Sequence, residues 1–102
     1  MAESSVRHVY VTATFRRSAK RASKHSPDLG KQILDAVELL EADMFAPSLK
    51  SHKLRGDLQG CWACSVTYSV RIVFEVGPPE VIRGFEAETI TLLTVGTHDE
   101  VY

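Results

Sequence analysis

Hydrophobic and polar positions follow two different periods along this chain of 102 residues. In most of the first half, apolar residues recur every three or four positions, which is the period of an amphipathic helix. From residue 58 onward they recur at every second position, which is the period of a strand. The pattern predicts a largely helical first half and a sheet-forming second half.

The first half opens with a predicted strand, because residues 8–13 alternate and are rich in β-branched side chains. Thr14 is then expected to cap a helix with a narrow apolar face, formed by Phe15, Ala19 and Ala22. Ser26 and Pro27 should begin a second helix, since serine suits the N-cap and proline the first helical position. Its apolar stripe consists of Leu29, Ile33, Ala36, Val37, Leu40 and Met44, and Pro47 prevents its continuation.

The second half is predicted to form consecutive strands. One is expected over residues 61–68 and another over 70–76, where Arg71 lies on the face opposite the most apolar row. The run Gly77-Pro78-Pro79 should end the latter, and residues 89–95 should form the last strand. The acidic stretch between them is interpreted as an excursion with room for a short strand at residues 81–82.

This order of elements predicts a single α+β domain over residues 1–102, with one twisted, mostly antiparallel sheet covered by a two-helix hairpin. The N-terminus lacks the apolar stretch of an export signal, and no run of eighteen apolar residues occurs. We therefore expect a cytoplasmic protein that does not enter a membrane.

Charge is distributed unevenly, although the net charge is −1. Residues 1–55 carry ten Lys/Arg against six Asp/Glu, and residues 56–102 carry two against seven. The first predicted helix contributes Arg16, Arg17, Lys20, Arg21 and Lys24. The asymmetry indicates a polyanion or an acidic partner, and a solvated helix face explains the same segment equally well.

Cys61 and Cys64 have the spacing of redox and zinc sites, which His52 and His98 could complete. Residues three apart in a strand point to opposite faces, so the two sulfur atoms should diverge across the sheet. We interpret both cysteines as reduced packing residues and expect neither a metal nor a cofactor.

His98 and Tyr102 are candidate chemical groups after the last predicted strand. Histidine side chains titrate near neutral pH and a phenol can donate a proton, so the pair suits proton transfer on a phosphodiester. On these residues alone, a surface histidine and a packed terminal tyrosine are the simpler interpretation.

Three segments in order, residues 51–56, 60–74 and 96–102, resemble toxins of the RelE/ParE superfamily, nearest to the RelE/YafQ branch. The resemblance covers nearly the whole chain and rests on the order and spacing of the three segments together. It implies a RelE-like fold and a small toxin that forms hetero-oligomers with a cognate antitoxin. In this branch it also implies an endoribonuclease that cuts mRNA, usually in the A site of the 30S ribosomal subunit.

Position by position, the resemblance makes His98 the general acid for the leaving 5′-oxygen and Tyr102 a group that orients or stacks on the substrate. Arg71 falls where RelE-like toxins carry an arginine that contacts the scissile phosphate. His52 occupies the place of a histidine in YafQ-like members and is the candidate base for the 2′-hydroxyl. The implied reaction is metal-free and leaves a 2′,3′-cyclic phosphate.

The chain departs from the family at Trp62 and Cys64, which stand where the RelE strand carries two lysines. The histidine and aspartate of YafQ likewise have no clear counterpart among residues 65–69. Trp62 is either a base-stacking residue or a core tryptophan. Together with Lys53, Arg55 and the basic first helix, it forms the predicted RNA-binding set, because ribosome contact depends on phosphate neutralisation.

Two other functions stay open. A ParE-like protein would inhibit DNA gyrase and cut nothing, but ParE-like proteins generally lack the set Arg71, His98 and Tyr102. A decayed toxin would retain only antitoxin binding. In every case the resemblance implies an antitoxin segment that covers the site or displaces the C-terminus.

Overall fold

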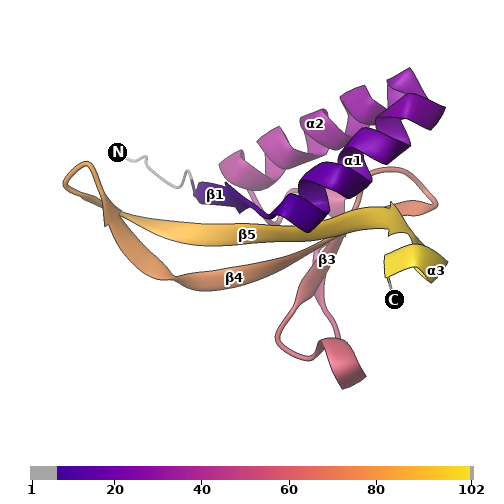
Figure 1. The fold of residues 1–102 in the computed structure, drawn as a ribbon. Coiled ribbons are helices and arrows are strands. Elements are labelled where there is room, and N and C mark those ends of the chain that lie inside the picture. Colours follow the sequence, from indigo (N-terminus) through magenta and orange to yellow (C-terminus); the bar gives the residue numbers. More distant parts are fainter. Residues whose placement is uncertain (1–6, 102) are drawn as a thin grey trace.

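The computed structural model describes residues 7–101, apart from the side chain of Ile82, and shows a five-stranded sheet with a helical hairpin on one face (Figure 1). The elements are β1 (His8–Val11), α1 (Ala13–His25), α2 (Pro27–Ala42), the short 3-10 helices η1 (Pro47–Leu49) and η2 (Gly56–Leu58), β2 (His52–Lys53), β3 (Trp62–Ser65), β4 (Val70–Ile82), β5 (Phe85–Thr97) and α3 (His98–Val101). The strand order is β1-β5-β4-β3-β2. β1 runs parallel to β5 and all other neighbours are antiparallel, which confirms the predicted α+β class.

The core lies between the helical hairpin and the sheet. Its fully buried side chains are Leu40, Leu49, Cys64, Ile72, Phe74, Ile90 and Leu92. Met44 is buried as predicted but does not belong to α2, which ends at Ala42 because Asp43 adopts an extended conformation. No helix among the described residues has the length and apolar content needed to cross a membrane.

The two helix starts differ in how well local sequence predicts them. Ser26 caps α2 as predicted, and its hydroxyl accepts the N–H of Leu29. α1, however, is capped by Thr12 and not by Thr14: the Thr12 hydroxyl accepts the N–H of Phe15 at 3.1 Å. The same hydroxyl donates to the carbonyl oxygen of Leu92 at 2.8 Å, so Thr12 also ties α1 to β5. The local sequence could not predict this cap, because a contact with a strand that is distant in sequence determines which threonine forms it.

The hairpin of β4 and β5 is longer than predicted. Pro78 and Pro79 lie inside β4, at a register shift between Gly77 and Glu80, and do not end the strand. β3 pairs with β4 only as far as Phe74, so one edge of β4 is open beyond that point, and an open edge tolerates residues without an N–H. The expected acidic excursion is therefore part of the two strands.

Arg83 and Gly84 connect the strands in a two-residue turn. Both have positive φ, 53° and 82°, as the twist of such a hairpin requires. The turn lies at the opposite end of the sheet from α3 (Figure 1).

Candidate functional site

The turn formed by residues 66–69 and the helix α3 meet at one end of the sheet. Val70, the first residue of β4, pairs with Thr97, the last residue of β5. The chain segments on either side of this pair, one leading into β4 and the other leaving β5, are therefore neighbours. Groups that are distant in sequence can act together at this end.

The turn begins earlier than predicted, because β3 stops at Ser65 instead of continuing to residue 68. The N–H groups of Val66 and Thr67 both donate to the carbonyl oxygen of Val70, at 2.9 and 3.3 Å. The hydroxyl of Thr67 accepts the N–H of Val70 at 3.2 Å. A threonine side chain that binds the backbone in this way competes with the strand ladder and reverses the chain.

Arg71 lies on the sheet face that α1 and α2 leave uncovered, as predicted. Its neighbours Val70 and Ile72 belong to the core, so the alternation of a strand points Arg71 the other way. Its Nη1 donates to the carbonyl oxygens of Thr67 and Tyr68, both at 2.9 Å. Within the described residues Nη2 and Nε make no hydrogen bond, which leaves them available to an anion.

The helix α3 lies over the same face as Arg71. Arg71 pairs with Gly96, and directly paired residues of antiparallel strands share a face. A Cβ added to Gly96 would lie 2.8 Å from Oε1 of Glu100 and 3.3 Å from Cγ1 of Val101. Figure 1 shows α3 on the opposite side of the sheet from α1 and α2. Arg71 and the helix that begins with His98 thus share one face and one end of the sheet.

One of the two hydrogen bonds of a capping box holds the start of α3, and the spacing of Thr97 and Glu100 is a local signal from which it could have been predicted. Oε1 of Glu100 accepts the backbone N–H of Thr97 at 2.8 Å, as in the pattern of a threonine followed three residues later by a glutamate. This hydrogen bond lowers the pKa of Glu100, with smaller contributions from the Thr97 hydroxyl and from the charges of Arg21 and His25. Glu100 therefore fixes the start of the helix, where His98 stands.

His98 is the first residue of α3, and its side chain is 72% exposed. Its Nδ1 lies 3.8 Å from Oδ1 of Asp99. The imidazole is accessible to a substrate from solvent. Tyr102, which was predicted to act beside it, lies outside the described residues.

His52 lies on the same face as Arg71 but two strands away. It pairs with Ala63 of β3, which pairs with Val73 of β4, two residues along from Arg71. Two strand spacings amount to about 10 Å. The imidazole is exposed, and its Nδ1 lies 3.0 Å from the carbonyl oxygen of Lys50. The sheet therefore does not bring His52 into contact with Arg71.

Trp62 lies on the opposite face from Arg71. It pairs with the buried Phe74, and their stacked rings have centroids 6.4 Å apart. Phe45 packs edge-on against the indole, and Nζ of Lys53 lies 5.6 Å from its centroid. The structure thus places Trp62 beside the core and does not bring it to the end of the sheet where Arg71 and α3 meet.

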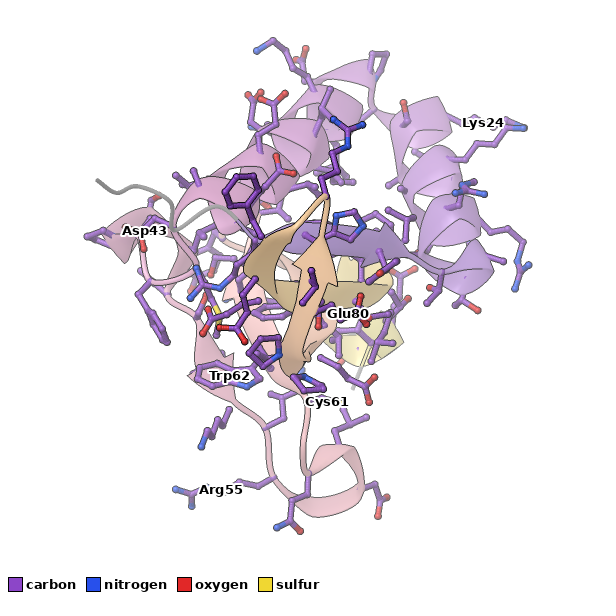
Figure 2. The ribbon with its side chains drawn as sticks, turned by 90° about the vertical axis from the view of Figure 1, so that its left-hand side faces the viewer. Lys24, Asp43, Arg55, Cys61, Trp62 and Glu80 are labelled. Carbon is purple, nitrogen blue, oxygen red and sulfur yellow. The ribbon has the colours of Figure 1, made fainter. Side chains whose placement is uncertain are left out.

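Lys53 and Arg55, together with Trp62, line an open hollow of about 890 Å³ in the loop between β2 and β3. Figure 2 shows Arg55 on the part of this loop that extends away from the molecule. The hollow is separate from the face shared by Arg71 and α3. It forms a second basic surface.

The predicted basic residues of α1 are all exposed, namely Arg16, Arg17, Lys20, Arg21 and Lys24. Because α1 packs on the other face of the sheet, most of them do not face Arg71. Arg21 and His25 are closest to the candidate site, since they line a pocket of about 440 Å³ together with Glu100.

Cys61 and Cys64 are both free, buried thiols. Burial raises the pKa of Cys64 to about 12, which keeps this thiol protonated at neutral pH. Among residues 7–101, no three His, Cys, Asp or Glu side chains gather closely enough to hold a metal ion. Their burial accords with the predicted packing role.

Solved structures with the same arrangement are bacterial toxins. YafQ from Escherichia coli strain BL21(DE3) superposes with a TM-score of 0.75 at 15% identity, over 94% of this chain and 98% of that chain. A YoeB/ParE toxin from Agrobacterium tumefaciens superposes with a TM-score of 0.70 at 19% identity, over 89% and 98%. YafQ in the Escherichia coli DinJ-YafQ complex gives a TM-score of 0.73 at 16% identity, over 94% and 98%. The fold is that of the RelE-like toxins.

The family is shown by sequence. The family model described as "Bacterial toxin of type II toxin-antitoxin system, YafQ" matches residues 7–102. The chain therefore belongs to the YafQ family of type II toxin-antitoxin toxins, which confirms the resemblance of its three segments to this branch. A search of curated proteins finds no match.

Proposed function

We propose that this toxin is an endoribonuclease that cleaves mRNA in the ribosomal A site and that a cognate antitoxin restrains it in the cytoplasm. The observation that carries the proposal is the pairing of Arg71 with Gly96, since it puts the guanidinium and α3 on one face at one end of the sheet. A charge-stabilising group and a proton donor on one exposed surface are what phosphodiester cleavage needs. A relative in the same fold was solved as the DinJ-YafQ complex, which supports an antitoxin as partner.

The proposed reaction is attack of the ribose 2′-oxygen on the adjacent phosphorus. The bond from phosphorus to the 5′-oxygen breaks, a base takes the 2′-hydroxyl proton, and His98 as imidazolium protonates the leaving 5′-oxygen. The products are a 2′,3′-cyclic phosphate and a 5′-hydroxyl. Nη2 and Nε of Arg71 bind the non-bridging oxygens as negative charge builds on them. No step uses a metal ion or another cofactor.

His52 is the proposed base, and Tyr102 is proposed to orient or stack on the substrate. His52 shares the face of Arg71, so a substrate laid across β3 and β4 would reach both groups. The imidazole of His52 is exposed and can accept a proton from a bound ribose.

The proposed ribosome contact uses the exposed basic residues of α1 together with Lys53 and Arg55. The acidic residues Glu75, Glu80, Glu86 and Glu88 belong to the β4–β5 hairpin, which projects away from α3 (Figure 1). Figure 2 shows Glu80 on this hairpin, apart from Lys24 on α1. This separation supports binding to ribosomal RNA although the net charge is only −1.

The proposal is tested with purified toxin, mRNA-programmed ribosomes and mapping of the RNA ends. Wild-type protein should yield fragments with 2′,3′-cyclic phosphate ends. His98→Ala should slow cleavage by about 10²- to 10⁴-fold, the usual contribution of a general acid. His8→Ala, on β1 and distant from α3, is the matched control and should cleave as wild type. Equal cleavage by both variants would reject His98 as the acid.

A gyrase supercoiling assay on the same preparation separates the other two functions. Inhibition of supercoiling without RNA cleavage would identify a ParE-like gyrase inhibitor. Inactivity in both assays, with antitoxin still bound, would identify a decayed toxin.

A further inference from the structure

We infer that Tyr68 is a stacking platform for an unpaired base next to the scissile linkage, an inference that rests on the proposed nuclease function. Tyr68 stands on the turn of residues 66–69, and its 98% exposure is the highest of the large apolar or aromatic side chains in the described residues. Aromatic rings that stack on bases need such an open face.

The position of Tyr68 ties it to the candidate site. The turn adjoins α3, because Val70 pairs with Thr97. The carbonyl oxygen of Tyr68 accepts a hydrogen bond from Nη1 of Arg71 at 2.9 Å. The guanidinium that would bind the phosphate therefore also fixes the backbone that presents the ring.

Hydrogen bonds hold the backbone of the turn, so stacking on Tyr68 would order few additional groups. Backbone bonds from Val66 and Thr67 to Val70 close it, and the Thr67 hydroxyl also accepts the N–H of Ser69 at 3.3 Å. The only remaining freedom of the tyrosine ring is then rotation around its two side-chain torsion angles. Recognition by such a ring costs little conformational entropy.

The fold gives no reason for a tyrosine at this place. Within residues 7–101 its ring packs against no other aromatic ring, and its hydroxyl makes no hydrogen bond. Glycine, asparagine or serine would suit a turn equally well without exposing a large ring to water. A ring that contributes nothing to packing is available to stack on a ligand.

The surroundings of Tyr68 favour RNA over a protein partner. Thr67, Ser69 and Arg71 are polar or charged, whereas a protein hot spot is enclosed by residues that exclude water. A single exposed ring, on a turn whose backbone an arginine holds, instead suits an unpaired nucleotide, because the ring can stack on the base and the guanidinium can bind a phosphate. Phe85 is 77% exposed at the far hairpin and provides a matched aromatic control.

The test measures binding without cleavage, in full-length His98→Ala protein, to a single-stranded RNA oligonucleotide that contains 2-aminopurine. Adding Tyr68→Ala should weaken RNA affinity by about 5- to 150-fold, the range expected for one stacked base. It should also abolish the fluorescence quenching that stacking causes. Tyr68→Phe should retain both properties, and Phe85→Ala should change neither. In protein that retains His98, Tyr68→Ala should raise KM on programmed ribosomes by the corresponding factor. Tyr68→Phe and Phe85→Ala should leave KM unchanged.

The outcomes separate this inference from the proposed function. If wild-type toxin cleaves mRNA and Tyr68→Ala matches it in both affinity and KM, the stacking role is rejected and the nuclease stands. If wild-type toxin cleaves nothing but binds RNA through Tyr68, the nuclease is rejected, and what stands is that Tyr68 stacks on an unpaired base without a scissile linkage beside it. If Tyr68→Ala weakens binding of a protein partner but not of RNA, or if no RNA binding is detected on either substrate, the inference is overturned.

Discussion

Gly96 lies directly under Glu100: a methyl group on Gly96 would come within 2.8 Å of Oε1 and 3.1 Å of Cβ of that glutamate. The same carboxylate accepts the N–H of Thr97 and so caps α3. The absence of a side chain at residue 96 lets the helix turn back onto the sheet beside Arg71. The position of His98 relative to Arg71 therefore depends on one small residue and one hydrogen bond.

Gly96→Ala should impair cleavage while the fold persists. The added methyl group displaces the Glu100 carboxylate from its place over Gly96 and crowds Cβ of Glu100 and Cγ1 of Val101, which would lie 3.1 and 3.3 Å away. The start of α3 must then shift, and overpacking of this kind costs about 1–3 kcal/mol. Thermal unfolding and the ribosome cleavage assay should show a modest loss of stability and a large loss of rate. Unchanged rate and melting temperature would show that α3 can shift without consequence.

Glu100 should titrate below the usual range of a glutamate, because its pKa is lowered first by the hydrogen bond from the Thr97 N–H. A lowered pKa in the folded state adds stability above the unfolded value, near 4.3. That stability is lost as the pH falls through the lowered folded value. Carbon-13 NMR of the carboxyl group measures the midpoint, and Arg21→Ala should raise it slightly, since Arg21 also lowers it. A midpoint at the ordinary value would contradict the cap.

Features decided by neighbouring residues were predictable from sequence. Ser26 and Pro27 begin α2 as expected, because cap and first turn depend only on local backbone groups. The face of Arg71 was predicted from the period of a strand, since Val70 and Ile72 flank it with core residues.

Features decided by strand pairing were not predictable in this way. Pro78 and Pro79 were expected to end β4, but the edge they occupy is open, which only the position of β3 determines. The placement of Arg71 and α3 on one face likewise depends on the register of β4 with β5, which the turn at Arg83 and Gly84 and the two register shifts between these strands determine. The cap formed by Thr97 and Glu100 is different, because it depends on a spacing of three residues that the sequence alone displays.

Cys64 should resist alkylation in the folded protein. Burial raises its pKa to about 12, and both burial and the charge of Glu75 raise the pKa of Cys61. At pH 8, iodoacetamide should label Cys61 slowly and Cys64 more slowly still, and both rapidly in denaturant, as mass spectrometry would record. Because the unfolded thiols ionise near pH 9 and Cys64 does not, stability should fall as the pH rises from about 9 to 12. Rapid labelling of native Cys64 would show that its segment opens.

Leu40 and Leu34 allow the same substitution to be compared at a buried and at an exposed position of α2. Leu40 is fully buried, so Leu40→Ala should cost about 2–5 kcal/mol of unfolding free energy through lost burial and a residual cavity. Leu34 is 58% exposed, so Leu34→Ala should change the free energy of unfolding by no more than about 0.5 kcal/mol. Urea denaturation measures both. Equal losses would mean that the outer face of α2 is also covered.

The basic face of α1 should determine how strongly ribosome binding depends on salt. Lys20 and Lys24 lie one helical turn apart and are exposed, and each phosphate contact they make adds about 0.7 to 0.9 to the slope of log affinity against log salt. Lys20→Gln combined with Lys24→Gln should lower that slope accordingly. Lys31→Gln on α2 is the control, because Lys31 pairs with Asp35 at 3.3 Å and lies outside the proposed contact. If the control lowers the slope as much as the double variant, the attraction comes from overall charge, and α1 is not the surface that meets the RNA.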